Sequence, residues 1–261
     1  MGNGSVPKES LLPTRRNRMA LRIDDTGFGG IKLIQDTDYF CYGTDAVLLA
    51  DFAARNRHVR AADLGTNNAV VPLIMSAITE IGYFAGIERD TGAVELAVRN
   101  VSENHLEDRI QIFPCDILDI PDHFPAASFD AVTANPPYFP SGRGWGNERP
   151  RLHAARHEST ASLDDFVKCA AYLLRPRGAF YMIHRPERLV DILVSCRSHE
   201  LEPKVLRFVC PREGKAPNML LIECRRKGGR ELKILPDLIV RSADGSRSPE
   251  LRQIYGQTKE L

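Results

Sequence analysis

The stretch "RAADLGTNNAVVPLIMSAITEIGYFAGIERD", residues 60–90, decides the fold. It begins with a short apolar run that ends in a glycine turn and continues as a longer apolar segment at residues 70–82. A second short apolar run then stops at charged residues. Pro72 falls in the first turn of the longer segment, where a helix tolerates proline. A strand, a helix and a second strand in this order predict one βαβ unit of a parallel sheet.

The alternation continues upstream and downstream of this unit. Apolar residues at positions 31–34 predict a short strand, and residues 45–54 predict a buried helix that Thr44 or Asp45 caps. Residues 91–106 predict an amphipathic helix, whose apolar face would carry Val94, Ala97, Val98 and Val101.

Three more strands and two more helices are predicted towards the C-terminus. The strands occupy residues 109–116, 128–138 and 179–189. One helix is capped by Ser162 and stopped by Pro176 and Gly178, and another continues to about residue 198. Apolar runs at residues 205–210 and 220–224 predict a closing hairpin. We therefore expect an α/β fold, a doubly wound, mostly parallel sheet with a C-terminal antiparallel hairpin.

The domain organisation follows from where this pattern begins and ends. We expect one domain at residues 23–256, between a flexible basic tail at residues 1–22 and a short tail at residues 257–261. The net charge is +1, from 35 basic and 34 acidic residues, so any nucleic-acid surface has to be local.

Composition excludes several other classes of protein. Six cysteines are scattered without a CxxC pair, which argues against a zinc ribbon or a disulfide framework and favours a reducing, cytoplasmic setting. No window approaches the roughly 18 apolar residues of a membrane span. Asp, His and Cys residues do not cluster with metal-ligand spacing, so we expect no metal site. The sequence does not indicate an oligomeric state.

Three successive predicted strands end in an acidic residue. The residues at these strand ends are Asp63 with Gly65 and Thr66, Glu88 with Arg89, and Asp116 with Ile117. In an open α/β sheet, ligands bind outside the carboxyl ends of the strands. A glycine turn admits a ligand close to the backbone, one acid can accept both hydroxyls of a ribose, and another can accept an adenine amino group. Together they predict an adenosine-containing cofactor, and the absence of P-loop spacing argues against a nucleoside triphosphate.

The next predicted strand ends in Asn135-Pro136-Pro137-Tyr138. The amino group of a nucleobase is a poor nucleophile, because its lone pair is delocalised into the ring. An Asn side-chain oxygen and a backbone carbonyl before proline can accept its protons and free the lone pair, and the prolines fix the direction of the carbonyl. Tyr138 can stack on a flipped-out base. The motif therefore predicts activation of an amino group by positioning and charge stabilisation rather than by a strong base.

These residues resemble a known family. Asn135-Pro136-Pro137-Tyr138 resembles the signature of class I, S-adenosylmethionine-dependent amino methyltransferases that act on nucleic acids or glutamine. The strings "GTDAVLLADFA", "NPPYFPSG", "AARHE", "HRPERL" and "LRFVCPR" resemble the tRNA adenine-N6 methyltransferases that modify the purine beside the anticodon of a valine tRNA. The resemblance covers roughly residues 25–256. It implies a class I, Rossmann-like methyltransferase with S-adenosylmethionine as cofactor and an adenine N6 amino group of tRNA as substrate.

The resemblance also assigns roles to residues. It implies that Asp63, Gly65 and Thr66 form the cofactor loop, that Glu88 binds the ribose and Asp116 the adenine, and that Asn135 to Tyr138 are catalytic. We add Asn67, Arg89, Ile117 and Asn135 to the expected cofactor-binding residues.

One departure from the family pattern concerns the cofactor loop. The family loop is usually Asp-Leu-Gly-Thr-Gly-Asn-Gly, whereas this chain has Asn67 and Ala69 in place of two glycines. Asn is the non-glycine residue that best tolerates positive φ, so Asn67 can keep the turn. Ala69 costs little if its φ is negative. We expect cofactor binding to survive, in a weakened form.

Residues 138–157 form a long polar segment beside the predicted site, a place where binding loops are common. Basic residues interleaved with an aromatic suit phosphate contacts and base stacking. The expected RNA-binding residues are Arg143, Arg149, Arg151, Arg156 and His157. The N-terminal arginines are read either as a solvated tail or as an RNA-touching arm.

Two alternatives remain open at the level of sequence. The same catalytic motif serves methylation of guanine N2 in RNA or of a protein glutamine amide. The altered cofactor loop also leaves room for an RNA-binding or scaffold homologue that has lost its cofactor.

Overall fold

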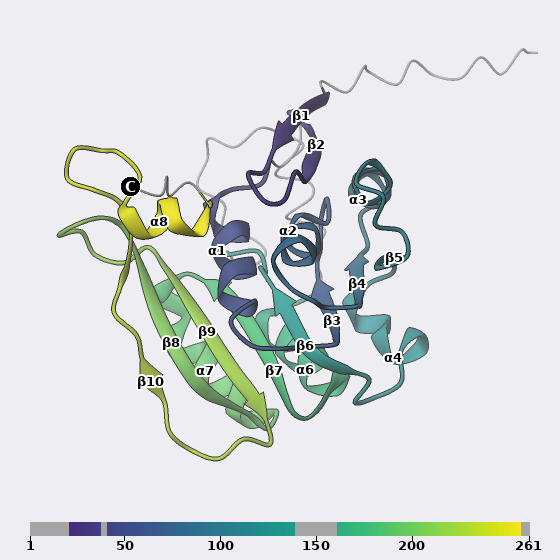
Figure 1. Ribbon diagram of the computed structural model, residues 1–261. Coiled ribbons are helices and arrows are strands. Elements are labelled where there is room, and N and C mark those ends of the chain that lie inside the picture. Colours follow the sequence, from purple (N-terminus) through teal and green to yellow (C-terminus); the bar gives the residue numbers. More distant parts are fainter. Residues whose placement is uncertain (1–20, 38–40, 139–160, 257–261) are drawn as a thin grey trace, which may run out of the picture.

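The structure, a computed structural model, describes residues 21–37, 41–138 and 161–256 (Figure 1). A small antiparallel hairpin pairs β1 (Leu21–Asp25) with β2 (Lys32–Asp36). A larger sheet contains β3 (Arg60–Leu64), β4 (Tyr83–Glu88), β5 (Ile110–Pro114), β6 (Phe129–Ala134), β7 (Leu174–His184), β8 (Leu201–Arg212), β9 (Met219–Arg226), β10 (Lys233–Ile234) and β11 (Leu238–Arg241).

Strand pairing in the larger sheet confirms a doubly wound topology. Along the sheet the order is β10-β8-β9-β7-β6-β3-β4-β5, and β11 also pairs with β8. Strands β3 to β7 are mutually parallel, and β9 is antiparallel to both β7 and β8. The predicted C-terminal antiparallel hairpin is therefore confirmed as β8–β9, with β9 inserted between β7 and β8.

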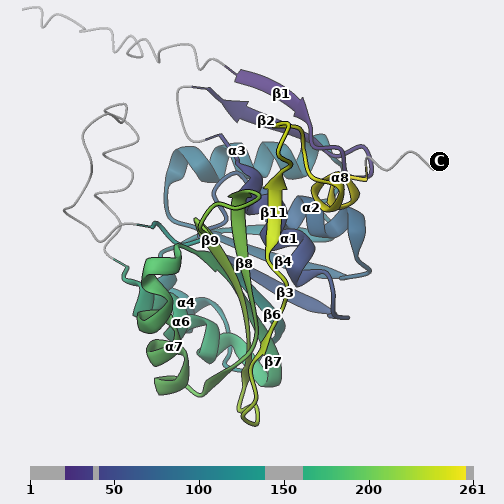
Figure 2. The ribbon, with the colours of Figure 1, turned by 90° about the vertical axis from the view of Figure 1, so that its left-hand side faces the viewer.

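Helices cover both faces of the sheet (Figure 2). The helices are α1 (Thr44–Ala53), α2 (Val70–Ile78), α3 (Thr91–Glu103), α4 (Ile120–His123), α6 (Leu163–Leu173), α7 (Leu189–Ser198) and α8 (Pro249–Ile254), with 3-10 turns at Ile117–Asp119 and Pro186–Arg188. One apolar core lies under α1, α2 and α3, and a second lies under α6 and α7. Because both faces are buried, the central strands are continuously apolar, as in β6, rather than alternating.

The first helix begins differently from the prediction. The N-cap of α1 is Gly43, and no side chain caps the helix, so the expectation that Thr44 or Asp45 caps it was wrong. Thr44 is already helical. Asp45 in the first turn instead bonds the backbone N–H of Ala46 through Oδ1, at 3.0 Å. Its other carboxylate oxygen is left for partners outside the helix.

The buried face of α3 also differs from the predicted one. Val98 is 50% exposed, whereas Asn100 is fully buried. The side chain of Asn100 donates to the carbonyls of Ile34 and Asn68, both at 3.0 Å, and accepts from the N–H of Ile34 at 2.6 Å. The helix therefore turns a polar residue inward, because Asn100 joins the β1–β2 hairpin to the loop after β3.

The boundary between α6 and β7 lies earlier than the sequence predicts. The expected cap is confirmed: Ser162 and Asp165 form a capping box. The helix ends at Leu173, however, and the strand begins at Leu174, so Pro176 and Gly178 belong to β7 rather than to a helix stop. Arg177 between them has a φ of +66°, and the pairing of β7 with β6 is irregular in this stretch. Strand β1 begins at Leu21, two residues inside the predicted tail.

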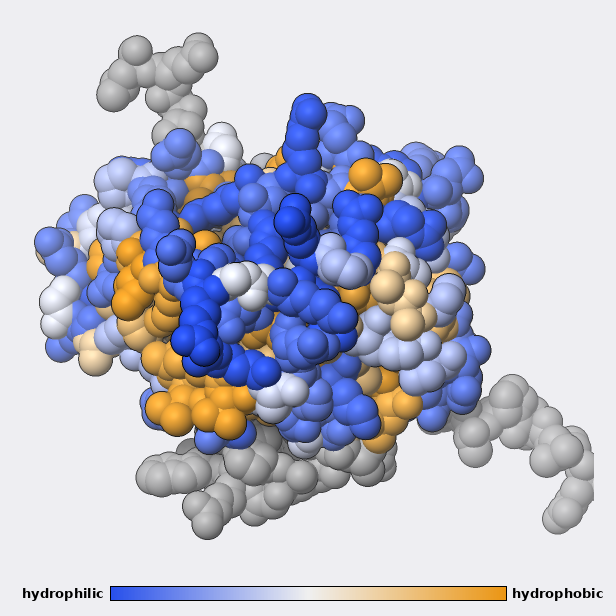
Figure 3. Space-filling model, turned by 90° about the horizontal axis from the view of Figure 1, so that it is seen from below, coloured by the Kyte–Doolittle hydropathy of each residue, from blue (hydrophilic) through white to orange (hydrophobic). Residues whose placement is uncertain are grey.

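Figure 3 shows the molecule from below, at the edge where the parallel strands begin. Strongly hydrophilic side chains cover the middle of this face, with hydrophobic groups around them. Exposed arginines at this edge include Arg57, Arg60, Arg175 and Arg177. Arg175 pairs with the buried Asp130 at 2.6 Å, and Arg60 lies 4.3 Å from the ring centre of Tyr83.

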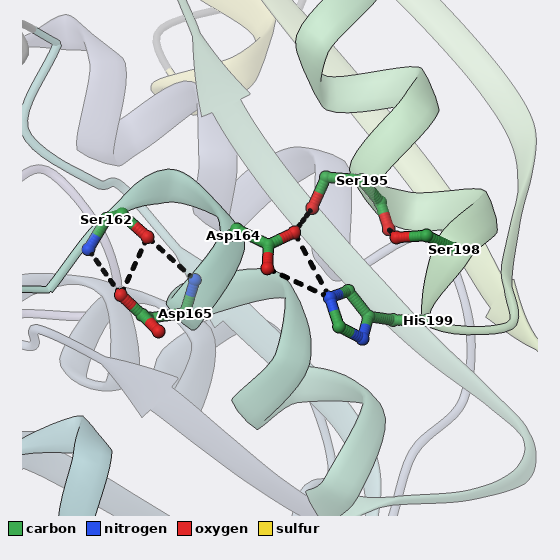
Figure 4. A network of polar contacts seen from close by, with 6 residues as sticks. All are labelled: Ser162, Asp164, Asp165, Ser195, Ser198 and His199. Carbon is green, nitrogen blue, oxygen red and sulfur yellow. Dashed lines mark hydrogen bonds and ion pairs between the residues drawn. The ribbon is translucent and has the colours of Figure 1, made fainter.

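Helices α6 and α7 are joined by a polar network (Figure 4). The Asp164 carboxylate accepts a hydrogen bond from Ser195 Oγ at 2.6 Å and contacts His199 Nε2 at 3.1 Å. Ser195 thus faces the carboxylate and not the imidazole, so these residues do not form a nucleophile–base pair. We assign this network to packing between the two helices.

Candidate active site

A cavity of about 780 Å³ lies at the carboxyl ends of β3, β4 and β6. It falls within the 300–1,000 Å³ typical of small-molecule sites. All four predicted strand ends line it, through Asp63, Glu88, Asp116 and Asn135, together with their neighbours Gly65, Thr66, Asn67, Arg89, Ile117, Pro136, Pro137 and Tyr138. The structure therefore brings the expected cofactor-binding and catalytic residues together around one space.

The loop after β3 turns back on the end of β4. The backbone N–H groups of Gly65 and Thr66 both donate to the carbonyl of Ile87, at 2.9 Å. Gly86 on β4 makes this approach possible, because a Cβ there would lie 2.9 Å from the Thr66 side chain. Gly65 has a φ of +68°, which suits glycine.

Two further residues of this loop have positive φ. The values are +51° at Asn67 and +65° at Ala69, the two positions where the family pattern has glycine. Asn67 tolerates this conformation, as expected. Ala69 does not meet the condition of a negative φ, and the left-handed conformation costs an alanine roughly 1–2 kcal/mol. The loop therefore carries backbone strain at Ala69.

Glu88 is held at the cavity by backbone donors. Its Oε2 accepts from the N–H of Asn67, and its Oε1 accepts from the N–H groups of Arg89 and Asp90, all at 2.9 Å. Burial raises the pKa of Glu88, and these three hydrogen bonds oppose the rise. Oε2 accepts only one of these bonds and keeps a second lone pair, so Glu88 can still accept a hydrogen bond from a ligand.

Asp116 closes the same side of the cavity. Its carboxylate accepts from Arg89 Nη1 at 3.0 Å and from the backbone N–H of Leu118 at 3.1 Å. The second bond makes Asp116 the N-cap of the turn at Ile117–Asp119. Arg89 is thus oriented by Asp116 across the strand ends.

Asp63 is the most deeply buried acid of the site, with 4% exposure. Burial raises its pKa to about 6, although a hydrogen bond from the Thr133 hydroxyl at 2.6 Å opposes the rise. Its titration midpoint therefore lies below neutral pH, and a cationic ligand group beside it would favour the ionised form further.

The motif at residues 135–138 is held by a residue that the sequence did not identify. Asn135 Nδ2 donates to Asp45 Oδ2 at 3.0 Å, and the Tyr138 hydroxyl donates to the same oxygen at 2.9 Å. A carboxylate only accepts, so it fixes the amide of Asn135 with Nδ2 towards Asp45 and Oδ1 away from it. The string "GTDAVLLADFA" contains Asp45, but only the contact shows that it supports the motif.

Tyr138 is also held from the end of β7. Its ring centre lies 5.5 Å from that of His184, nearly edge to face, and the Arg185 guanidinium carbon lies 5.2 Å from the ring centre. Burial raises the pKa of Tyr138 far above its usual range, so it stays protonated and donates. Burial lowers the pKa of His184 to about 4, and its Nδ1 accepts from the N–H of Arg185 at 2.7 Å. His184 is therefore neutral and structural.

The residues present fit the adenosine-containing cofactor that the strand ends predict. Asn67 Oδ1 and Asn68 Nδ2 are buried beside the cavity and have no hydrogen-bond partner within the described residues. Buried polar atoms are nearly always satisfied, so an acceptor and a donor are available here for a ligand. The Asn67 side chain lines the cavity without filling it.

Some predicted residues lie outside the part of the chain that the structure describes. These are the expected RNA-binding residues Arg143, Arg149, Arg151, Arg156 and His157, and most of the N-terminal tail. Within the described ranges, no group of three or more His, Cys, Asp or Glu side chains could hold a metal ion. The described helices include none that is long and apolar enough to cross a membrane.

The chain is similar to proteins of known type. The family model "Methyltransferase small domain" matches residues 37–190. The tRNA1(Val) (adenine(37)-N6)-methyltransferase of Porphyromonas gingivalis is 30% identical over 216 residues, which cover 80% of this chain and 84% of the relative. The protein of the same name from Pectobacterium carotovorum is 29% identical over 213 residues, covering 81% and 84%.

Solved structures confirm the fold class. A predicted O-methyltransferase from Agrobacterium tumefaciens superposes with a TM-score of 0.67 at 21% identity, covering 83% of this chain and 98% of that one. A geranyl diphosphate methyltransferase in complex with S-adenosylmethionine superposes with a TM-score of 0.51 at 15% identity, covering 70% and 84%. At these identities the likeness shows the fold alone, that of class I methyltransferases.

The family model spans more than half of the chain, and the cavity lies at the strand ends where this fold binds its ligand. The relatives match most of the chain at about 30% identity. The chain belongs to the methyltransferase small domain family and, within it, to the family of the tRNA1(Val) (adenine(37)-N6)-methyltransferases.

Proposed function

We propose that this protein transfers the methyl group of S-adenosylmethionine to the N6 amino group of an adenine in tRNA. The observation that carries the proposal is the meeting of the cofactor loop and the Asn135–Tyr138 motif in one cavity. The names of the relatives support the substrate class. A tRNA substrate agrees with the cytoplasmic setting expected from the free cysteines.

The residues of the chain that would hold the cofactor lie on the β3–β5 side of the cavity. Glu88 would accept hydrogen bonds from the ribose, Asp116 would face the adenine, and Asp63 with the loop from Gly65 to Asn67 would line the remainder. When bound, S-adenosylmethionine supplies a methyl group on a positively charged sulfur. Asp63 and Glu88 suit a cationic ligand, because they place negative charge beside it.

Asn135 would orient the amino group that is methylated. Because its Nδ2 is committed to Asp45, its Oδ1 remains to accept one hydrogen of the amino group. The carbonyl of Pro136 would accept the other, and the ring of Tyr138 would stack on the base. Two acceptors draw the nitrogen towards tetrahedral geometry, so that its lone pair points at the methyl group.

The Asn135→Ala variant tests this arrangement. Removal of the acceptor should abolish methyl transfer while the affinity for S-adenosylmethionine, measured by calorimetry, stays nearly unchanged. Normal turnover in this variant would rule out the assigned role of the motif.

The finer substrate is proposed from the family alone: the adenine beside the anticodon of a valine tRNA. The rivals are guanine N2 in RNA and a protein glutamine, which the same four residues can serve. Nucleoside mass spectrometry of tRNA from a deletion strain separates them. Loss of N6-methyladenosine supports the proposal, and loss of N2-methylguanosine supports the first rival.

The strained loop raises the question of whether the cofactor still binds. Titration of the protein with S-adenosylmethionine, beside the Asn67→Gly variant, answers it. Saturable one-to-one binding to the wild type supports an active enzyme. If only the glycine variant binds, the chain is a cofactor-deficient homologue with an RNA-binding or scaffold role.

A further inference from the structure

The two sides of the cavity mouth differ in charge. On the side of β3, β4 and β5 the described lining residues include four carboxylates, with Arg89 as the one cation; they are Asp63, Glu88, Asp90 and Asp116. Arg89 is itself paired with Asp116 at 3.0 Å. A phosphate backbone would be repelled on this side, so an RNA that inserts one base is expected to lie across the other side.

Beyond the motif at residues 135–138, the sheet continues into β7, β9, β8 and β11, whose residues do not line the cavity itself. His184 at the end of β7 pairs with Leu220 on β9, which pairs with Phe208 on β8. The last residues of β8 and the turn at residues 213–218 therefore extend beyond β7 at the cavity edge of the sheet. Arg212 ends β8, and Arg241 is its register partner on the parallel strand β11.

Arg185 connects this turn to the catalytic motif. Its guanidinium carbon lies 5.2 Å from the ring centre of Tyr138, and its Nη1 donates to the carbonyl of Asn218 at 3.0 Å. A guanidinium has five N–H donors, so most of them remain for other acceptors. A positive charge thus stands beside the ring on which the target base would stack.

Four cations gather on this side, and none forms an ion pair within the described residues; they are Arg185, Arg212, Lys215 and Arg241. We call them the β7–β8 basic surface. All except Arg185 are exposed. Three carboxylates occupy the same turns, and one of them, Asp244, already accepts hydrogen bonds from Ser246. Cations thus outnumber carboxylates by four to three here, whereas the cofactor side has four carboxylates and one cation.

We propose that the β7–β8 basic surface binds the phosphate backbone of the tRNA on either side of the target adenine. The proposal rests on the function proposed above, in that tRNA is taken as the substrate. Phosphates next to a base stacked on Tyr138 lie within reach of Arg185, and further phosphates along the strand meet Arg212, Lys215 and Arg241. Such contacts fix the register of an RNA without reading its sequence.

The opposite edge of the sheet is the main alternative surface for binding the tRNA backbone. There Arg57 and Arg177 are exposed and form no ion pair within the described residues. The six-residue strand β6 separates this edge from the cavity, a distance of about 20 Å at roughly 3.3 Å per residue. General attraction by positive charge would favour both edges, whereas the geometry of the site favours only the β7–β8 side.

Two double variants with the same change of charge separate these cases. Arg212→Glu with Lys215→Glu alters the β7–β8 basic surface, and Arg57→Glu with Arg177→Glu alters the opposite edge. Binding to unmodified tRNA is measured by filter binding from 50 to 200 mM salt, and S-adenosylmethionine affinity is measured to verify folding.

We expect the first variant to raise the Kd for tRNA about tenfold. The slope of log K against log salt concentration should become shallower by about 1.5, as for two lost phosphate contacts. The second should change the Kd by less than about twofold, because it touches no phosphate near the site.

Equal losses in the two variants, a loss in the second alone, or unchanged binding in both would overturn the proposal. So would a wild-type protein that does not bind tRNA. The failure of the proposed function has a different signature, since tRNA would then bind through this surface without being methylated.

Discussion

Asp45 accepts hydrogen bonds from Asn135 and Tyr138 on one oxygen, and this fixes the direction of the Asn135 amide. In Asp45→Asn the charge is lost, and the amide NH2 has to face either the N–H of Ala46 or both donors of the motif, because those two donors share one oxygen. We expect kcat to fall by about 10- to 100-fold, the range that a misplaced reacting group can cost. The Kd for S-adenosylmethionine should change by less than about twofold.

Single-turnover methylation and calorimetry on the same Asp45→Asn preparation measure these two quantities. Asp45→Glu, which keeps the carboxylate, is the matched control and should recover part of the rate. An unchanged kcat in Asp45→Asn would contradict the positioning role.

Asp63 should make the stability of the fold depend on pH. Its pKa is about 6 in the folded protein, against an ordinary value of 3.8 for an aspartate side chain in water. Between these values the folded state binds the proton more tightly, so stability falls as pH rises from about 4 to 6 and is level above. Asp63→Asn removes the ionisable carboxyl and with it this loss of stability at high pH. The variant should be more stable than the wild type by up to about 3 kcal/mol at pH 7.5, but hardly at pH 4. Urea unfolding at both pH values tests this, and an equal effect at both would contradict it.

Ala69 adopts a φ of +65° in the buried loop. In Ala69→Gly, relief of about 1–2 kcal/mol of strain is offset by the loss of a buried methyl, about 0.8 kcal/mol, and by greater freedom of the unfolded chain. We expect a net change below about 1 kcal/mol. Ala69→Val combines the strain with a branched side chain and should cost more than about 2 kcal/mol. Denaturant unfolding compares the two, and a Val variant as stable as the wild type would refute the strain.

The sequence could identify the acids of the site but not the residue that supports the motif. The positions of Asp63, Glu88 and Asp116 could be predicted, because parallel strands place their carboxyl ends at one edge of the sheet. Asp45 was not, because its role depends on a contact between α1 and the loop after β6, across 90 residues of sequence. The sign of φ at Ala69 could not be predicted from the sequence either, because it depends on how the loop packs against β4.

At the scale of elements, α6 carries one wall of the cavity through Phe166, and its start is fixed by a capping box. Ser162 Oγ accepts from the N–H of Asp165 at 3.2 Å, and Asp165 Oδ2 accepts from the N–H of Ser162 at 2.8 Å. Ser162→Ala should destabilise the protein by about 1 kcal/mol. Ser198→Ala, at the exposed end of α7, is the control and should cost less. Thermal unfolding gives both values, and equal losses would contradict the cap.

Element types were predictable where the hydrophobic pattern is strong, and boundaries were not. The apolar runs of β3, β4 and β6 and the helix α2 between them were read correctly. Pro176 and Gly178 looked like helix stops, but β7 tolerates both next to its irregular pairing with β6. The face of α3 was misjudged because a buried Asn100, satisfied by β2 and the cofactor loop, replaces an apolar residue.

At the scale of the molecule, the C-terminal helix completes the first core. Leu251 of α8 and its C-cap residue Tyr255 are buried there, and Glu250 pairs with the buried Arg207. Removal of residues 249–261 should cost about 3–6 kcal/mol from the two apolar side chains. Denaturant unfolding of this truncated chain measures the loss, and truncation after residue 256 should leave α8 intact and serve as control. Unchanged stability after the longer truncation would show that α8 does not belong to the core.

The general architecture was predictable because strand–helix alternation admits few topologies. The order of strands in the sheet was not, since it depends on pairing over long distances. Strands β10 and β11 and helix α8 were missed because each is too short to show a hydrophobic period, although β11 is mostly apolar.

The packing of Phe28 against Tyr255, with ring centres 5.7 Å apart, also has a consequence for synthesis. At roughly 5–20 residues per second, Tyr255 is made on the order of 10–45 s after Phe28. Until then the apolar side chains beneath the β1–β2 hairpin stay partly exposed to solvent while translation continues. The N-terminal hairpin is therefore the part of the nascent chain that we expect chaperones to hold longest.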